Sequence, residues 1–417
     1  MLTLDDYSWL GSSTGLDIWR LLSARSSPAT PAAIRSEFGC SSSQAELLHE
    51  QHLLAIGKGR DKVEQPHRWF WTRQLLEQSS DEWTAQETAR DAPLHTPHWI
   101  DACCGAGSDA IALARRRAGV LAVDNQPMAI LLARANAKMN DVELDLQAGD
   151  IESFSFERDS FLNIDPDRRP DGERTIDPFR SQPTWNWISQ AAHRLNSVSL
   201  KLAPGFRLQP DFAWGSASRP QAMRWLSWGG SVRQQRWYWG VDRWPDDARV
   251  VSAGNSRLGW HHEVFPSVSE SDISGAAEYI HDSHQLSPGF VADQDPVIRA
   301  AAVGDALAKR LGVHCIGDRH GYFYSPLPVA HPMLRWFEIL TIVAMDFKKV
   351  RAVARSMPVS VWELKSRGIE IDLPSWRRVL PVDVKSDQQR TILFTRVGKR
   401  HIAIFARRIE TESSNPC

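Results

Sequence analysis

A glycine-bearing turn near residue 100 carries the strongest chemical signal in the sequence. Residues 101–109 read Asp-Ala-Cys-Cys-Gly-Ala-Gly-Ser-Asp and follow apolar residues that are typical of a strand. Gly105 and Gly107 let the backbone turn sharply and approach a ligand closely, and the free amides at the start of a helix favour a carboxylate. A Gly-x-Gly turn alone is weak support, so the acidic residues around it decide the interpretation.

Three aspartates fall at the ends of three successive predicted strands. Asp101 ends the first strand, and Asp124, 23 residues later, ends the second, where a carboxylate can bind both hydroxyls of a ribose. Asp150 closes the third strand, where it suits an adenine amino group with Ile151 against the ring. Together they predict a site shaped for a nucleoside. The alternative is that each carboxylate only caps a helix or a turn, and it is stronger for a single residue than for the set.

Dinucleotide-binding dehydrogenases are the nearest competing class. When their fingerprint is aligned on Gly105 and Gly107, its third glycine would fall at Ala110. The turn therefore favours a ligand without a pyrophosphate.

These residues resemble the class I S-adenosylmethionine-dependent methyltransferases. The turn is similar to the D-x-x-C-G-x-G variant of several RNA-modifying enzymes. More narrowly, nearly the whole chain resembles a bacterial family that joins such a domain to a THUMP-like carboxy-terminal domain. The stretches that carry this likeness are Leu76-Glu77-Gln78, Asn163-Ile164-Asp165-Pro166-Asp167-Arg168-Arg169, Lys201-Leu202-Ala203-Pro204-Gly205, Val297-Ile298-Arg299-Ala300 and Lys365-Ser366-Arg367-Gly368.

The resemblance implies S-adenosyl-L-methionine as the cofactor. It places Glu77 and Gln78 just before the first strand, where they would close over the methionine end, although an exposed helix face explains them too. The predicted cofactor-binding residues are Asp101, Cys103, Gly105, Gly107, Asp124, Asn125, Asp150, Ile151, Glu77 and Gln78.

The segment after the fourth strand holds the predicted catalytic residues. Amino-directed methyltransferases carry Asn/Asp-Pro-Pro-aromatic there, and this chain keeps Asp165-Pro166 but continues with Asp167-Arg168-Arg169. The resemblance makes Asp165 the candidate acceptor of the departing proton. The two arginines could bind a phosphate or stack on a base, or they could pair with neighbouring aspartates as a structural network; both interpretations stay open.

Methylation at a pyrimidine C5 by the common RNA route needs a cysteine nucleophile. The family comparison places it after the fifth strand, where the chain has Lys201-Leu202-Ala203-Pro204-Gly205 and no cysteine. Cys103 and Cys104 lie in the cofactor turn instead. Direct transfer of the methyl group to a nitrogen or oxygen is therefore the simpler expectation.

The order of strand and helix patterns predicts an α/β fold in three parts. Residues 1–92 show helical patterns, and residues 93–290 alternate strands and helices as in a Rossmann-like parallel sheet. A Trp-rich segment over about 206–265 has period-two stretches typical of an appended β-hairpin. Residues 291–417 mix helices and strands, and the resemblance assigns them to a THUMP-like α+β domain.

Charge and composition limit the partners. The whole chain carries 49 basic and 50 acidic residues, but residues 331–417 carry 16 Lys and Arg against 9 Asp and Glu, a net charge of +7. A basic appended domain favours phosphate-rich partners, so we expect structured RNA to bind there. The alternatives are methylation of a small molecule or a protein, and a catalytically silent protein that binds the cofactor and RNA.

The cysteines, the apolar stretches and the histidines argue against a membrane span and a metal site. Five cysteines, odd in number, fit a reducing cytoplasm, and no apolar stretch approaches the roughly 18 residues of a membrane span. The histidines, such as His261-His262 and the pair His281 and His284, have no Cys-x-x-Cys motif with them. We therefore expect a cytoplasmic protein without a metal site.

Overall fold

The computed structural model describes residues 2–168, 173, 175–209, 211–266, 277–286, 288–317 and 321–410. Arg169, one of the predicted catalytic residues, lies outside these ranges. The chain divides into two compact units. One holds Met1–Met223 and Arg233–Asp246, and the other holds Arg224–Val232 and Asp247–Cys417. The three-part division expected from the sequence remains a prediction.

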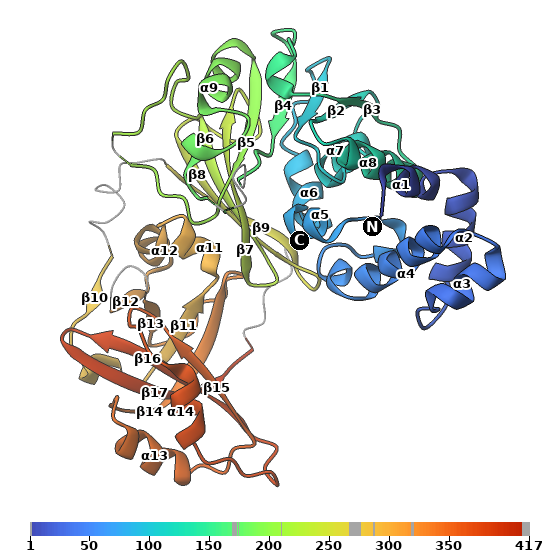
Figure 1. Cartoon of the computed structure of the whole chain (residues 1–417). Coiled ribbons are helices and arrows are strands. Elements are labelled where there is room, and N and C mark those ends of the chain that lie inside the picture. The colour runs from blue at the N-terminus through green and yellow to red at the C-terminus, as the bar shows by residue number, and fades with distance from the viewer. Residues whose placement is uncertain are drawn as a thin grey trace. The chain divides into compact units, whose positions relative to one another are not determined.

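The first unit begins with six helices (Figure 1). They are α1 (Leu4–Leu10), α2 (Ser13–Ser23), α3 (Pro31–Phe38), α4 (Ser42–Ile56), α5 (Arg73–Gln78) and α6 (Glu82–Ala89). Each follows a Ser, Thr or Asp whose side chain accepts a hydrogen bond from a backbone N–H in the first turn. A buried cluster that includes Trp19, Trp69 and Phe70 holds α1 to α5 together, and the predicted helical amino-terminal part is confirmed.

A mostly parallel sheet completes the first unit. Its strand order is β3-β2-β1-β4-β5-β7, with β1 to β5 parallel and β7 antiparallel to β5. The strands are β1 (Trp99–Ala102), β2 (Val120–Asp124), β3 (Asp145–Ala148), β4 (Phe161–Ile164), β5 (Ser197–Leu202) and β7 (Ser231–Trp239); the helices between them are α7 (Ser108–Ala114), α8 (Pro127–Met139) and α9 (Trp185–Arg194). The predicted Rossmann-like α/β fold is confirmed.

Burial follows the sequence pattern of the sheet. Every residue of β1, β4 and β5 is buried, as expected for parallel strands covered on both faces. The carboxyl ends of β1, β2 and β4 meet at one edge, because these strands are parallel neighbours. Ligands of open α/β sheets bind at such an edge.

The second unit contains two groups of strands. In the first group, β6 (Ala222–Trp228), β8 (Ala248–Asn255) and β9 (Gly259–Pro266) lie in that order, with β8 and β9 antiparallel. The second is an eight-stranded sheet of order β10-β12-β13-β11-β14-β17-β16-β15. Its strands are β10 (Tyr279–Ile280), β11 (Phe290–Gln294), β12 (His314–Ile316), β13 (Tyr322–Ser325), β14 (Leu334–Ala344), β15 (Val361–Ser366), β16 (Gln389–Val397) and β17 (Arg400–Arg408).

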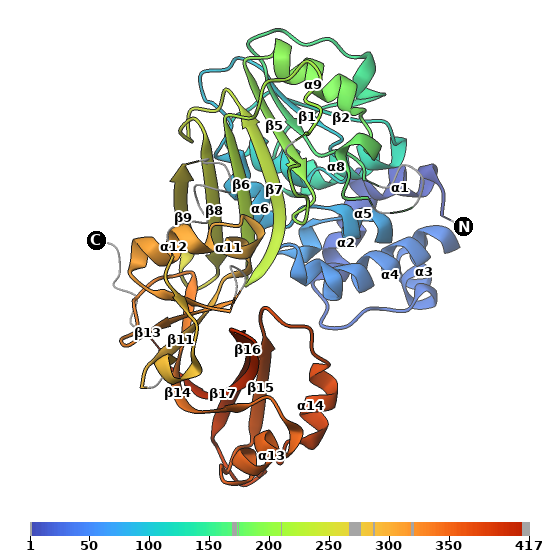
Figure 2. The ribbon, with the colours of Figure 1, turned by 90° about the vertical axis from the view of Figure 1, so that its left-hand side faces the viewer.

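Four α-helices are assigned among the described residues of this unit. They are α11 (Pro296–Ala300), α12 (Gly304–Leu311), α13 (Phe347–Arg355) and α14 (Leu373–Val379). Helices α13 and α14 pack against β15, β16 and β17 (Figure 2), and Val350, Trp376, Trp362 and Phe405 are buried in that core. This α+β arrangement agrees with the predicted carboxy-terminal fold.

Candidate functional site

A cavity of about 440 Å³ lies at the edge where β1, β2 and β4 end. Eight predicted cofactor residues line it: Glu77, Gln78, Cys103, Gly105, Asp124, Asn125, Asp150 and Ile151. Four predicted catalytic residues line it as well: Asp165, Pro166, Asp167 and Arg168. The structure therefore brings both predicted groups together, whereas Asp101 and Gly107 lie outside the lining.

Two backbone N–H groups of the turn after β1 donate hydrogen bonds to the end of β2. The Cys104 N–H donates to the Val123 carbonyl at 3.0 Å, and the Gly105 N–H donates to Asp124 Oδ2 at 2.8 Å. Gly105 has a φ of 54°, in the region that glycine adopts without strain. The turn and the acidic strand end thus form one preorganised wall of the cavity.

Asp124 has hydrogen-bonding capacity left for a ligand. Its Oδ2 accepts from Gly105 and its Oδ1 accepts from the Gln126 N–H at 2.9 Å, so each oxygen keeps a second acceptor site. Burial raises the pKa of Asp124, and these two backbone amides partly oppose that rise. Two vicinal hydroxyls of a ribose suit such a carboxylate.

Asp150 fits both interpretations given for it. Its Oδ1 accepts from the Glu152 N–H at 3.0 Å and caps the short 3₁₀ turn Ile151–Ser153. The residue is also exposed and lines the cavity, and Ile151 beside it is buried. The turn-capping role does not compete with an adenine contact, because a carboxylate accepts several hydrogen bonds.

Gly107 has a packing role that its place in the motif did not reveal. Its φ is 90°, and an added Cβ would lie 3.2 Å from Cβ of Ala133. Helix α7 starts at this glycine, and Ala133 lies in α8. Gly107 therefore allows a close approach to α8, and a direct contact with the cofactor remains a prediction.

Asp101 lies in a buried polar network beneath the cavity. Asn163 Nδ2 donates to Asp101 Oδ1 at 2.7 Å, and Arg236 Nη1 donates to Asn163 Oδ1 at 2.5 Å. Arg236 also pairs with Asp109 at 3.3 Å. Burial, and then the charge of Asp109, raise the pKa of Asp101 well above its usual range. The network fixes the end of β1 from which the turn departs.

Sequence reasoning gave no role to Asn163 or Arg236. The strand register could have indicated the contact between Asn163 and Asp101, since the two residues are partners on adjacent strands. Arg236 comes from β7; the sequence predicted an appended hairpin in this segment but not its position beside β5.

Asp165 is held by a buried lysine. Lys201 Nζ donates to Asp165 Oδ2 at 2.6 Å and to Ser80 Oγ at 2.8 Å. The Lys201 side chain is 8% exposed, and that of Asp165 is 23% exposed. The Lys-x-x-Pro-Gly stretch contains this lysine, to which the sequence assigned no role. The register of the two strands could have indicated this pair. Ile164 and Leu200 are partners in the sheet, and Asp165 and Lys201 are the residues that follow them.

A second lysine lies in the same electrostatic environment. Burial, and then the nearby charge of Lys201, lower the pKa of Lys62 to about 8. Its Nζ donates to the Ser79 carbonyl at 2.5 Å. Lys62 and Lys201 place positive charge behind Asp165, and the sequence offered no signal for Lys62.

The cysteines of the turn are poor nucleophiles. Burial raises the pKa of both Cys103 and Cys104 well above the usual range, and nearby aspartates add to the rise. The neutral thiol is the unreactive form.

For Glu77 and Arg168, the structure does not decide between a functional and a structural role. Glu77 lies on α5 and forms an ion pair with Lys58 at 2.9 Å, with 47% of its side chain exposed. Because it also lines the cavity, a role in closing over a ligand remains a prediction. The two roles proposed for Arg168 stay open as well.

The comparisons with known proteins agree with this geometry. The family profile described as "Methyltransferase domain" matches residues 100–164, which run from β1 through β4. The profile described as "THUMP domain-like" matches residues 334–408. These likenesses support an S-adenosylmethionine-dependent methyltransferase of class I.

Two curated relatives come from two strains of Mycobacterium tuberculosis, and both are described as uncharacterised S-adenosylmethionine-dependent methyltransferases. Each is 25% identical over 345 residues, which cover 79% of this methyltransferase and 86% of the relative. A crystal structure from Porphyromonas gingivalis W83, described as a candidate methyltransferase, has a TM-score of 0.73 at 16% identity. It covers 98% of this chain and 100% of its own, and it supports the fold.

Within the described ranges, the methyltransferase has no helix that is both long and apolar enough to span a membrane.

Proposed function

We propose that this methyltransferase acts on RNA and transfers a methyl group directly to a base nitrogen. The observation that carries the proposal is Asp165-Pro166 in the cavity wall, with Asp165 fixed by Lys201 at 2.6 Å. Asp165 would then be a positioned proton acceptor in the cavity that Asp124 and Gly105 also line. A cytoplasmic location, expected from the cysteine usage, is part of the proposal.

The residues around the cavity fit S-adenosylmethionine. Asp124 would take the ribose hydroxyls, and Asp150 with Ile151 would take the adenine. The turn at Gly105 would face the methionine end, with Glu77 and Gln78 on the other side. When bound, the cofactor supplies an activated methyl group for an in-line displacement.

Asp165 is assigned to the target nitrogen. Lys201 occupies Oδ2, so Oδ1 is the oxygen that would accept the hydrogen bond from the target amine and then its proton. General-base assistance of this kind contributes roughly 10²- to 10⁴-fold to a rate. Holding the amine in line with the methyl group contributes through orientation.

The cysteines argue against the C5 route. That route needs a thiolate, and the raised pKa of Cys103 and Cys104 keeps both thiols protonated. Nitrogen is therefore preferred over a ring carbon as the methyl acceptor.

The THUMP-like region supports RNA as the substrate. Residues 334–408 contain 16 Lys and Arg against 7 Asp and Glu. The exposed basic residues of α13 are Lys348, Lys349, Arg351 and Arg355, and those of α14 are Arg377 and Arg378. Clustered exposed cations of this kind bind phosphates in a salt-dependent manner.

The product of the reaction tests the proposal. The protein is incubated with tritiated S-adenosylmethionine and total RNA, and in parallel with a protein extract and a small-molecule extract. We expect label in RNA, and an N-methylated nucleoside after nuclease digestion. Label only in protein or small molecules would contradict RNA as the substrate, and a C5-methylated pyrimidine would contradict the mechanism. Asp165→Asn is the matched variant, because it keeps the size of the side chain and removes its basicity.

A further inference from the structure

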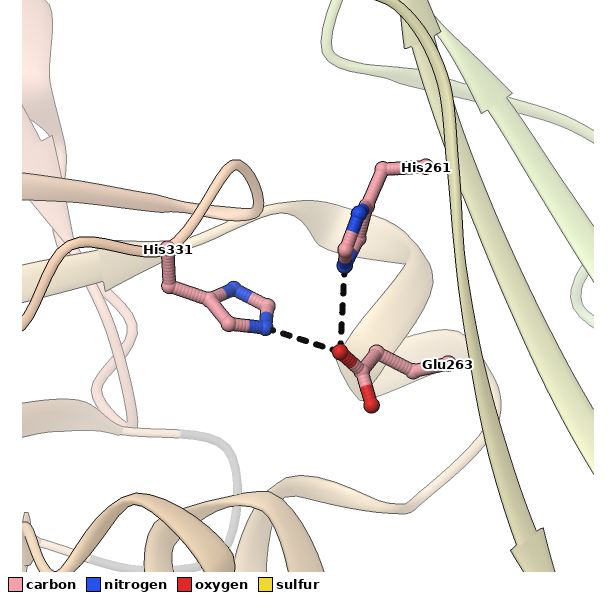
Figure 3. Close-up of side chains that lie close together, drawn as sticks. All are labelled: His261, Glu263 and His331. Atoms are coloured by element: carbon pink, nitrogen blue, oxygen red, sulfur yellow. Dashed lines mark hydrogen bonds and ion pairs between the residues drawn. The ribbon is translucent and has the colours of Figure 1, made fainter. Parts of the chain in front are cut away.

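Two histidines converge on one carboxylate in the second unit. His261 Nε2 lies 3.0 Å from Glu263 Oε1, and His331 Nε2 lies 3.1 Å from the same oxygen (Figure 3). One ligand atom from each of the three residues lies within 4.8 Å of the other two. The cluster lies outside the methyltransferase cavity and has no part in the mechanism above.

The strand geometry explains how the cluster forms. His261 and Glu263 are two residues apart on β9, so their side chains point to the same face. His331 reaches that face from the segment just before β14. Three side chains from two segments far apart in the sequence thus point to a common centre, which spacing in the sequence did not predict.

The distances fit a small divalent cation. Zinc binds imidazole nitrogen at about 2.0–2.1 Å and carboxylate oxygen at about 2.0–2.2 Å in tetrahedral geometry. With these bond lengths, two ligand atoms of a tetrahedral site are about 3.4 Å apart. The two nitrogen–oxygen distances are a few tenths of an ångström shorter than this, so small side-chain movements would admit an ion.

The burial of the three side chains also suits a metal ligand set. The side chains of His331, Glu263 and His261 are 7%, 16% and 36% exposed, so the cluster is sheltered but open on the His261 side. Arg310 forms an ion pair with the carboxylate through Oε2 and leaves Oε1 to the histidines. Such outer partners orient metal-binding carboxylates.

One contact opposes the ion. The Met333 N–H donates to His331 Nδ1 at 3.2 Å, which favours the neutral tautomer with its proton on Nε2. A metal at Nε2 requires the other neutral tautomer, in which the proton has moved to Nδ1 and faces the Met333 N–H, so this contact must be lost. We therefore expect binding to be weaker than at a fully preorganised site.

We propose that His261, Glu263 and His331 bind one Zn²⁺ ion, with water at the fourth position. The ion would tie β9 to the segment before β14. Two imidazoles and a carboxylate are a ligand set that zinc uses with an open position. The proposal is independent of the methyltransferase function, and it differs from the expectation of no metal site drawn from the sequence.

Titration with Co²⁺ tests the site, because tetrahedral Co²⁺ has a strong visible absorption. The full chain is stripped of metal with a chelator and titrated with Co²⁺, and Zn²⁺ is then added. We expect one equivalent of tetrahedral Co²⁺ per chain, displaced by one equivalent of Zn²⁺. His261→Ala should weaken binding at least about tenfold. Because His261 is the most exposed ligand, we expect this variant to fold, and circular dichroism checks it.

His262→Ala is the matched control. His262 lies next to His261 on β9, points to the opposite face and contacts Ser252 Oγ at 2.9 Å. Its loss should leave the Co²⁺ affinity unchanged. Glu263→Gln is a second ligand variant with nearly the same shape, and it should also lose affinity. No binding at one equivalent by the wild-type chain would overturn the proposal, and so would binding that persists in both His261→Ala and Glu263→Gln.

Discussion

Lys201 is the partner of Asp165, the carboxylate that is assigned to the target amine. It is nearly buried and donates to both Asp165 and Ser80, which fixes the carboxylate assigned to the target amine. Its charge is matched in the fold by that carboxylate. A positioning role for Lys201 follows, because it touches Asp165 and does not line the cavity.

Lys201→Met tests this role. We expect kcat for methyl transfer to fall roughly 10- to 100-fold, because Asp165 loses the partner that orients it. The affinity for S-adenosylmethionine should not change, since Asp124 and the turn are untouched. Rapid-quench kinetics and calorimetry measure the two quantities. Equal losses of affinity and rate would indicate a general structural defect instead.

The sequence predicted single residues best where a strand end meets the cavity. Asp124, Asp150 and Asp165 all line it, as their positions at strand ends implied. Lys62 could not be predicted, because its position depends on how the amino-terminal helices pack and not on any motif. Asp101 was predicted to bind the cofactor; it is buried in a network with Asn163 and Arg236, and its role toward the cofactor remains a prediction.

Among the elements, the contact between α7 and α8 depends on Gly107. Gly107→Ala would combine a positive φ with a Cβ that lies 3.2 Å from Ala133. The matched control is Gly119→Ala, where φ is 81° and nothing lies within 4 Å of the added Cβ. We expect a loss of about 1–2 kcal/mol at Gly119 and roughly 1–3 kcal/mol more at Gly107. Urea unfolding measures both, and equal losses would contradict the packing role.

The polar network between β1, β4 and β7 gives a pH dependence. Burial raises the pKa of Asp101, so the folded state binds this proton more tightly than the unfolded state. Stability from this group is therefore present at acidic pH and is lost as pH rises from about 4 towards the raised pKa. Asp101→Asn keeps an acceptor for Asn163 and removes the titration. We expect the variant to gain stability relative to the wild type as pH rises.

Urea unfolding at several pH values between about 4 and 7 checks this expectation. A difference between wild type and Asp101→Asn that does not change with pH would contradict it. So would a difference of the opposite sign, which would mean that Arg236 stabilises the ionised form more than burial opposes it.

The helices and strands were largely predictable, because the spacing of apolar residues along the chain follows which side of each element is buried. The run of β1, α7 and β2 follows from apolar clusters separated by a glycine turn. The pairing of β7 with β5 was not predictable, since the Trp-rich segment shows alternation but not its partner. The same segment contains β9, whose contact with residue 331 no local pattern could show.

Across the whole molecule, the uneven charge is the basis of the proposal that the THUMP-like region binds RNA. We expect the double variant Lys348→Glu and Lys349→Glu to bind RNA about tenfold or more weakly at low salt. The slope of log affinity against log salt should become shallower by about one for each phosphate that the variant no longer neutralises. Arg134→Glu with Lys138→Glu is the control, since it makes the same charge change on exposed positions of α8.

Filter binding over a range of salt concentrations measures both variants. Equal weakening by both pairs would show that only net charge matters, which would contradict a binding face on α13. We expect all the variants to fold, because all four side chains are exposed, and circular dichroism verifies this.

We propose that the cavity at the ends of β1, β2 and β4 binds S-adenosylmethionine through Asp124. The most direct measurement is calorimetric titration with S-adenosylmethionine and separately with NAD, for the wild type, Asp124→Asn and the exposed control Asp145→Asn. We predict one site per chain for S-adenosylmethionine, none for NAD, and a loss of roughly 100-fold only in Asp124→Asn, as expected for hydrogen bonds to a charged group. Binding of NAD alone, or unchanged affinity in Asp124→Asn, would contradict the account.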